Sequence, residues 1–127
     1  MQVKSDCFYT KNDEWVLIEG DVATVGLTDY AQDALSDIVF VELTAGIGDT
    51  IAAEDQIATV ESIKAVSDVY APVAGEVIAL NDAVSDSPEL INQDPFGAAW
   101  LIKLKGSFDT SALMDAAAYE AWCADRH

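Results

Sequence analysis

A succession of short strand-like runs, each closed by turn-forming residues, constrains the fold of this chain more than any other feature. Gly20 and Asp21 separate the first two runs and predict a hairpin between them. The runs are rich in β-branched and apolar residues and cover 14–18, 22–27, 37–43, 56–61, 65–70, 75–80 and 99–104. Residues 37–43 are apolar on both faces, which is typical of a buried strand. The pattern predicts a mainly β protein.

Short helices are predicted around these strands. Thr28 is suited to be the N-cap of a helix at residues 29–35, and Pro88 is suited to the first turn of another. Residues 109–111, Asp-Thr-Ser, are expected to cap a C-terminal helix that runs to about Asp125. One stripe of this helix is interpreted as core packing, and it consists of Met114, Ala118, Ala121 and Trp122.

A weak internal repeat suggests how the strands are arranged. Residues 47–51 (IGDTI) and 80–84 (LNDAV) share the pattern apolar, Gly or Asn, Asp, any residue, Ile or Val. Gly and Asn both tolerate the left-handed backbone of a tight turn. Two related β-turns predict two similar half-sheets that close into a small flattened barrel. The length of 127 residues fits a single domain over residues 1–127.

The charge balance excludes several classes of partner. Six basic residues against 23 acidic ones give a net charge of −17, which repels nucleic acid and anionic lipid. No apolar run approaches the ~20 residues that a membrane-spanning helix needs. The first residues do not read as a secretory signal. We therefore expect a cytoplasmic protein, or a mitochondrial matrix protein if a transit peptide has been removed.

The nucleophilic and metal-ligating residues are few and poorly spaced for chemistry. Cys7 and Cys123 lie near opposite ends of the chain and predict two free thiols in a reducing compartment. His127 is the only histidine. We therefore expect no metal site, no catalytic residues of the Ser-His-Asp or Cys-His type, and no enzyme activity of those classes.

Lys64 is the basic residue with the most unusual setting. Between Lys11 and Lys103 there are 18 carboxylates and this single cation. Ser62 suits the first position of a type I turn, with Ile63 and Lys64 at its centre, and no glycine is present for a primed turn. A Schiff-base lysine needs burial or a neighbouring cation, and the sequence predicts neither. Lys64 is better placed to be acylated by an enzyme that brings an activated acyl group.

The segment around Lys64 resembles a known family. Residues 60–77 (VESIKAVSDVYAPVAGEV) are similar to the lipoylation segment of glycine cleavage system H proteins. The similarity continues in order through residues 14–16 (EWV), 28–32 (TDYAQ), 37–43 (DIVFVEL), 88–92 (PELIN) and 100–103 (WLIK). It covers nearly the whole chain.

The resemblance implies a barrel-sandwich hybrid fold and a carrier without catalytic activity of its own. Lys64 would bear lipoate in amide linkage. Implied partners are the pyridoxal-phosphate glycine decarboxylase, which loads an aminomethyl group, and the tetrahydrofolate-dependent aminomethyltransferase, which removes it. Dihydrolipoamide dehydrogenase would reoxidise the dithiol, and lipoyl-attaching enzymes would modify the lysine.

Further site residues are implied by the same resemblance. Glu14 and Asp68 match positions that the family uses to dock the cationic end of the loaded arm, and Glu61 is expected to help the modifying enzyme recognise the turn. The family usually has His before the Glu-Trp pair, where this chain has Asp13. The change replaces a titratable cation with an acid near the expected cleft.

Three other interpretations share the hairpin lysine. A biotin carrier would normally have Met on both sides of the lysine, where this chain has Ile63 and Ala65. A lipoyl domain of a 2-oxo acid dehydrogenase would usually be followed by a flexible linker and a catalytic core. An unmodified acidic interaction module could use the same fold.

Overall fold

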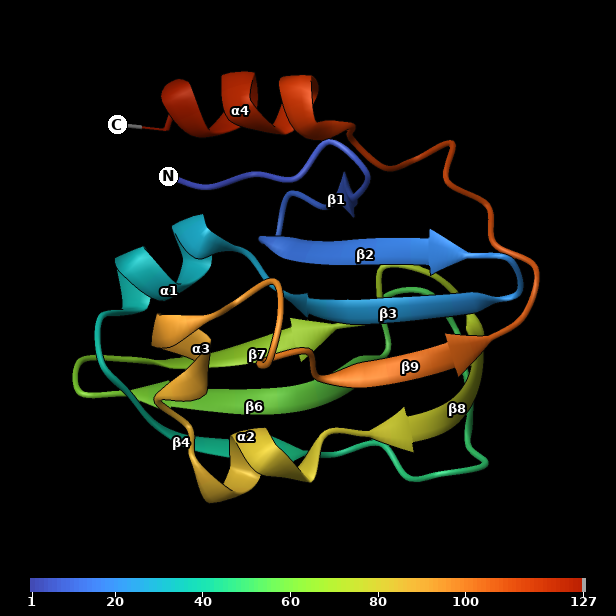
Figure 1. Ribbon diagram of the computed structural model, residues 1–127, viewed down its shortest axis with the longest axis horizontal. Helices are drawn as coiled ribbons and strands as arrows, with labels where there is room; N and C mark the ends of the chain where they lie inside the picture. Colours follow the sequence, from blue (N-terminus) through green and yellow to red (C-terminus); the bar gives the residue numbers. More distant parts are fainter. Residues whose placement is uncertain (127) are drawn as a thin grey trace.

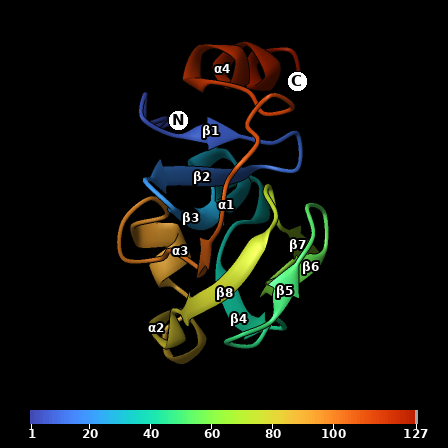
Figure 2. The same cartoon turned by 90° about the vertical axis from the view of Figure 1, so that its right-hand side faces the viewer.

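The computed structural model describes residues 1–126 and contains two antiparallel sheets that face each other (Figures 1 and 2). The larger sheet has the order β1-β2-β3-β9-β8-β5, and the smaller has the order β4-β6-β7. The strands are β1 (Phe8–Tyr9), β2 (Glu14–Glu19), β3 (Val22–Leu27), β4 (Ile38–Leu43), β5 (Thr50–Ile51), β6 (Gln56–Ser62), β7 (Val66–Tyr70), β8 (Gly75–Leu80) and β9 (Ile102–Lys105). The prediction of a mainly β protein is confirmed.

The described part of the chain has four short helices outside the sheets, and they are α1 (Asp29–Leu35), α2 (Asp82–Asp86), α3 (Leu90–Gln93) and α4 (Ala116–Ala124). Figure 2 shows α4 stacked beyond β1, at one end of the larger sheet. No helix in residues 1–126 is long and apolar enough to cross a membrane.

The β2–β3 hairpin forms as its sequence predicts. Gly20 adopts φ of +65° in the connecting turn, a conformation that glycine reaches without steric cost. Trp15 pairs with Gly26 on β3, and its indole ring lies directly over the glycine. A Cβ at residue 26 would come within 2.6 Å of that ring, so only glycine leaves room for the tryptophan. The indole N–H then donates to the carbonyl oxygen of Pro95 at 3.0 Å.

The predicted cap of α1 is confirmed, whereas the prediction for β4 is partly wrong. Thr28 caps α1 as predicted, because its side chain accepts a hydrogen bond from the N–H of Ala31 at 3.1 Å. The prediction of a fully buried strand at residues 37–43 is wrong for one face of β4. Val39 is 55% exposed and Phe40 is 45% exposed. The smaller sheet buries only its inner face, since no layer of the described chain covers the outer one.

The C-terminal helix begins later than predicted. Asp115, not the 109–111 segment, caps α4, and its carboxylate accepts from the N–H of Ala118 at 2.8 Å. Asp109 instead accepts from the N–H of Ser111 in a local turn. The predicted core stripe is only half correct: Met114, which precedes the helix, and Trp122 pack against the second core cluster, whereas Ala118 and Ala121 are exposed. The buried residues of α4 are Tyr119 and Cys123.

The prediction of two equivalent turns from the internal repeat is only half correct. Gly48 lies in a tight turn with φ of +90°. Asn81 instead has φ of −92° and caps α2, so the second copy of the pattern starts a helix. The predicted strand at residues 99–104 is shorter than expected, because β9 begins at Ile102.

The core is divided into two clusters. The main cluster fills the space between the sheets and is built from aliphatic side chains of both. The second cluster lies between the larger sheet and α4, where the rings of Tyr9 and Tyr119 stack at 4.6 Å. Cys7 and Cys123 are both buried there as free thiols, as predicted. Burial raises the pKa of the Cys7 thiol to about 12, with a smaller contribution from Asp6.

Candidate functional site: the Lys64 hairpin and the Glu14 cleft

Lys64 lies at the tip of the β6–β7 hairpin, which projects from the left of the molecule in Figure 1. Its side chain is exposed, and among the described residues it makes no ion pair. The N–H of Ser62 donates to the carbonyl oxygen of Ala65 at 2.8 Å, which closes the last rung of the hairpin. The tip is therefore only two residues long, Ile63 and Lys64, as predicted.

The Ser62 side chain holds this tip in place. Its Oγ accepts from the N–H of Ala65 at 3.1 Å and from the N–H of Lys64 at 3.3 Å. The N–H of Ile63 donates to the carbonyl oxygen of Asp37 at 3.0 Å, so the segment before β4 supports the loop from the other side. Neither tip residue has a positive φ, in agreement with a turn that is not of the primed type. The backbone beneath Lys64 is thus held by hydrogen bonds, while its side chain is exposed.

The tip is surrounded by exposed apolar residues. Seven large apolar side chains are exposed in the described chain, and four of them belong to the tip or to the neighbouring strands. We call this group the tip patch; it consists of Val39, Phe40, Ile63 and Val66. Cross-strand pairing places Glu61 between Phe40 and Val66. An apolar patch of this kind, interrupted by one carboxylate and one lysine, is characteristic of an interaction surface.

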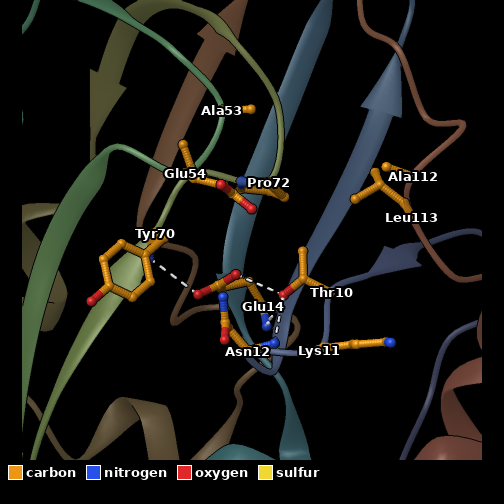
Figure 3. A pocket seen from close by; sticks show the side chains of 11 residues that line it. Thr10, Lys11, Asn12, Glu14, Ala53, Glu54, Tyr70, Pro72, Ala112 and Leu113 are labelled. Atoms are coloured by element: carbon orange, nitrogen blue, oxygen red, sulfur yellow. Dashed lines mark hydrogen bonds between the residues drawn. The ribbon is translucent and has the colours of Figure 1, made fainter.

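A cleft of about 300 Å³ lies where β2 and β7 approach each other. Thr10, Lys11, Glu14, Glu54, Tyr70 and Leu113 contribute to its walls (Figure 3). These residues come from the β1–β2 turn, from the loop before β6, from the end of β7 and from the segment before α4. The cleft is therefore assembled from segments far apart in the sequence.

Glu14 is the central polar group of the cleft, and its residue is only 1% exposed. One carboxylate oxygen accepts from the Thr10 hydroxyl at 2.6 Å, and the other accepts from the N–H of Tyr70 at 3.1 Å. Burial raises the pKa of Glu14, and the charges of Asp13 and Glu54 raise it further. The two hydrogen bonds lower it, because they stabilise the carboxylate form.

Glu54 and Lys11 complete the charge pattern of the cleft. Glu54 has φ of 74°, and its N–H donates to the carbonyl oxygen of Ala71 at 2.7 Å. Its carboxylate faces the cleft in Figure 3, whereas the Lys11 side chain extends away from Glu14. The Lys11 ammonium lies 5.1 Å from the centre of the Trp122 ring. The cleft thus presents carboxylates inward and holds its cation at the edge.

Asp68 lies outside the walls of this cleft. It is exposed on β7 and accepts from Gln56 Nε2 at 3.2 Å and from the Thr59 hydroxyl at 3.4 Å. Because side chains alternate along a strand, Val66, Asp68 and Tyr70 share one face of β7. The structure therefore does not bring Asp68 next to Glu14. It places Asp68 between the Lys64 tip and the cleft.

Comparisons with known proteins decide the family. The family model described as glycine cleavage H-protein matches residues 7–126. A glycine cleavage system H protein of Azoarcus sp. is 53% identical over 126 residues, covering 97% of this chain and 98% of the relative. One from Thermus thermophilus is 49% identical over 122 residues, covering 94% of each chain.

The chain belongs to the glycine cleavage H-protein family. A crystal structure of a glycine cleavage system H protein from Mycobacterium marinum superposes with a TM-score of 0.88 at 36% identity and covers 96% of this chain and 99% of that one. The two sheets and flanking helices are thus the lipoyl-carrier barrel-sandwich fold, as expected. Members of this family are non-catalytic lipoyl-carrier subunits of the glycine cleavage system.

The residue that departs from the H-protein pattern has a different setting from the one expected. Asp13 does not line the cleft, although it precedes Glu14. Its carboxylate forms an ion pair with Arg126, with Nη2 and Oδ2 2.9 Å apart, and accepts from the Tyr119 hydroxyl at 2.8 Å. The additional acid therefore faces α4 and is neutralised there.

Lys64 lies at the hairpin tip and Glu14 in the cleft, and their functional roles stay predictions, whereas Glu54 and Arg126 were missed by sequence reasoning. Both missed residues act through contacts with segments distant in the chain, and neither belongs to a local motif. The left-handed backbone of Glu54 is also invisible in the sequence, because no glycine marks it.

We predict a pH-dependent difference in stability between the wild-type chain and Glu14→Gln. Since the pKa of folded Glu14 is raised, the folded chain binds more protons than the unfolded chain at pH values between the two pKa values. The contribution of Glu14 to the free energy of unfolding therefore falls as the pH rises through this interval. Denaturant unfolding at a series of pH values above about 4 should show that the free energy of unfolding of Glu14→Gln increases relative to that of the wild type as the pH rises.

An Asp68→Asn variant controls for the loss of one carboxylate elsewhere on the same surface. A difference between wild type and Glu14→Gln that is constant across this pH range would contradict the buried setting of Glu14.

Proposed function

We propose that Lys64 is the lipoyl attachment point of this H-protein family member and that residues 1–127 act as one carrier domain. The carrier takes an aminomethyl group from the glycine decarboxylase to the aminomethyltransferase, and then presents its dithiol to dihydrolipoamide dehydrogenase. The observation that carries the proposal is the exposed Lys64 side chain, which makes no ion pair within residues 1–126, on a backbone that three hydrogen bonds to Ser62 and Asp37 hold in place.

The residues present fit a covalently attached lipoyl group. Acylation needs an amine that an enzyme can reach, and the tip offers one with no long neighbouring side chain except Ile63. An attached dithiolane would supply a disulfide that opens when it accepts the carried group, so that one sulfur would bear the group, the other would become a thiol, and the dithiol would form only when the group leaves. The chain itself supplies position, because tethering raises the effective concentration of a group near each partner.

The face of β7 supports a path between Lys64 and the cleft. Val66, Asp68 and Tyr70 lie in line on this face, and Tyr70 is part of the cleft wall. At about 3.3 Å per residue, Val66 and Tyr70 are roughly 13 Å apart along the strand. Asp68 in the middle of this path provides a negative charge for a cationic group that moves along it.

Glu14 is suited to hold the cationic end of the loaded arm. A carboxylate in a half-enclosed cleft attracts an ammonium group more strongly than an exposed one, since water screens the pair less. Thr10 and the Tyr70 N–H orient both carboxylate oxygens, and the lone pairs that remain are available to a ligand. Glu54 adds a second carboxylate at the rim. Bound there, the amine is removed from bulk water.

The tip patch and Glu61 support recognition by the enzymes that act on Lys64. Apolar side chains around a modified residue provide contact area. Glu61 lies among them and provides a charge that can orient the partner enzyme. The net charge of −17 favours partners with basic docking surfaces. We propose the cytoplasm as the site of action, in keeping with the bacterial relatives.

We predict that Lys64→Arg abolishes lipoylation and leaves the fold intact. Arginine keeps the positive charge and the length of the side chain but cannot form the amide under enzymatic acylation. Intact-mass and peptide mass spectrometry of protein produced in a lipoate-replete host should show the lipoyl increment on the wild type and none on the variant. Lys105→Arg, an exposed change on β9, is the matched control and should keep the increment.

A lipoyl increment on any lysine other than Lys64, or a biotinyl increment, would overturn the attachment proposal. Near-identical thermal unfolding of wild type and Lys64→Arg verifies that the loss is local, because exposed loop substitutions change stability little.

We predict that Glu14→Gln shortens the lifetime of the amine-loaded protein more than Asp68→Asn does. Loss of the buried carboxylate removes a charge-assisted contact, so we expect about a tenfold shorter lifetime. Loss of the exposed Asp68 carboxylate should shorten this lifetime by no more than about fivefold. Ammonia release from the loaded protein measures both. The Asp68 effect should vanish at high salt and the Glu14 effect should persist; equal lifetimes for all three proteins would remove both residues from arm docking.

We predict that Glu61→Gln slows lipoylation of the unmodified protein by a lipoate ligase, by about threefold or more in kcat/KM. Its matched control is Glu42→Gln, an exposed acid on β4 of the same sheet. Equal rates for the two variants would remove Glu61 from recognition, while a full mass increment at saturation would still establish Lys64 as the acceptor.

A further inference from the structure

Asp13 and Arg126 connect the cleft turn to the C-terminal helix. Besides the ion pair, the Tyr119 hydroxyl on α4 contacts both the Asp13 carboxylate, at 2.8 Å, and the Thr28 hydroxyl, at 2.7 Å. The carbonyl oxygen of Asp13 accepts from the N–H of Thr28 at 3.0 Å. Both the backbone and the side chain of Asp13 are therefore fixed by α4 and by the start of α1.

Arg126 is itself held in a defined position. Its guanidinium lies 4.2 Å from the centre of the Tyr30 ring on α1 and 5.5 Å from that of Trp122 on α4. The side chains of Arg126 and Asp13 are 25% and 14% exposed, so solvent screens their ion pair only partly. The ion pair with Asp13 raises the pKa of Arg126.

Asp13 and Glu14 are neighbours in one turn, but the Asp13 side chain faces α4 and the Glu14 side chain faces the cleft. Asp13 has φ of 67°, and its N–H donates to the carbonyl oxygen of Thr10 at 3.2 Å. Thr10 in turn accepts from the N–H of Glu14 and donates to the Glu14 carboxylate. Any displacement of Asp13 is therefore transmitted to the hydrogen bonds that hold Glu14.

The electrostatic environment of Glu14 depends on whether the negative charge of Asp13 is compensated. Glu54 faces Glu14 from the loop before β6, Tyr70 faces it from β7, and the Lys11 ammonium is held over Trp122. Asp13 is the adjacent carboxylate, and Arg126 is its counter-ion. Without Arg126, a second uncompensated negative charge would lie next to the buried Glu14 and disfavour its ionised form.

We propose that Arg126 is a positioning residue for the cleft: through its ion pair with Asp13 it fixes the turn that presents Glu14 and cancels the negative charge beside it. A residue just after the C-terminal helix thereby affects the charge of a cleft to which that helix contributes no wall. The consequence for a bound amine rests on the proposed docking role of Glu14, whereas the charge coupling itself does not.

The test compares Arg126→Gln with Asp13→Asn in the unmodified protein. Carbon-13 NMR of the Glu14 carboxyl gives its pKa. Arg126→Gln leaves Asp13 uncompensated and should raise the pKa of Glu14. Asp13→Asn removes the adjacent acid, keeps a residue that tolerates positive φ, and should lower it. Arg126→Lys should restore most of the wild-type value, and Lys105→Gln controls for net charge.

Opposite shifts separate charge compensation from a purely structural role. A turn that merely loosens would expose Glu14 in both variants and move its pKa in the same direction. Shifts of equal sign, or no shift with Arg126→Gln, would overturn the proposal.

The loaded protein provides the second measurement. At pH values at which Glu14 is partly protonated, Arg126→Gln should shorten the lifetime of the amine-loaded form by about threefold, the size of one partly screened charge interaction. The deficit should disappear as the pH rises and Glu14 ionises fully. An undiminished deficit at high pH would contradict the charge mechanism. If Lys64 is not lipoylated, the proposed function fails, yet the NMR comparison on the unmodified protein still decides the role of Arg126.

Discussion

The register between β6 and β7 is the constraint on which the rest of the arrangement depends. Pairing of Glu61 with Val66 leaves room for only two residues at the tip, and pairing of Gln56 with Tyr70 sets the other end of the hairpin at the cleft. A slip of one residue would turn every side chain of β7 to the opposite face. Lys64 would leave the tip, and the Tyr70 N–H would no longer reach Glu14. One ladder thus positions both ends of the proposed arm path.

The cleft is obtained at some expense in stability. A carboxylate as buried as Glu14 loses hydration, and two hydrogen bonds compensate for that loss only in part, as the raised pKa shows. A neutral side chain of similar shape would be easier to bury. The chain nevertheless keeps an ionisable group in a cleft where a cationic ligand could meet it out of bulk water. Under the proposed docking role of Glu14, function and stability are in conflict at this residue.

The features that could be predicted best from the sequence are those that neighbouring residues determine, such as turns and helix caps. The β2–β3 hairpin and the Thr28 cap follow from turn residues and from alternation, and both were correct. The start of α4 was predicted wrongly because Asp109 and Ser111 do form a capping-like hydrogen bond, in a turn that no helix follows. The exposure of Phe40 depends on which layer covers a sheet, and alternation does not reveal that. The Asp13–Arg126 contact joins residues 113 positions apart, beyond the reach of any motif.

The burial of both cysteines has a consequence for redox specificity. Thiol–disulfide exchange requires a thiolate, and the Cys7 thiol, with a pKa of about 12, is almost entirely protonated at neutral pH. Cys123 is equally enclosed, behind the rings of the second core cluster. A dithiolane attached to Lys64, as proposed, would meet neither thiol at the outer surface of its carrier. Under the proposed lipoylation of Lys64, the scaffold would therefore be protected from mixed disulfides with the group that it carries.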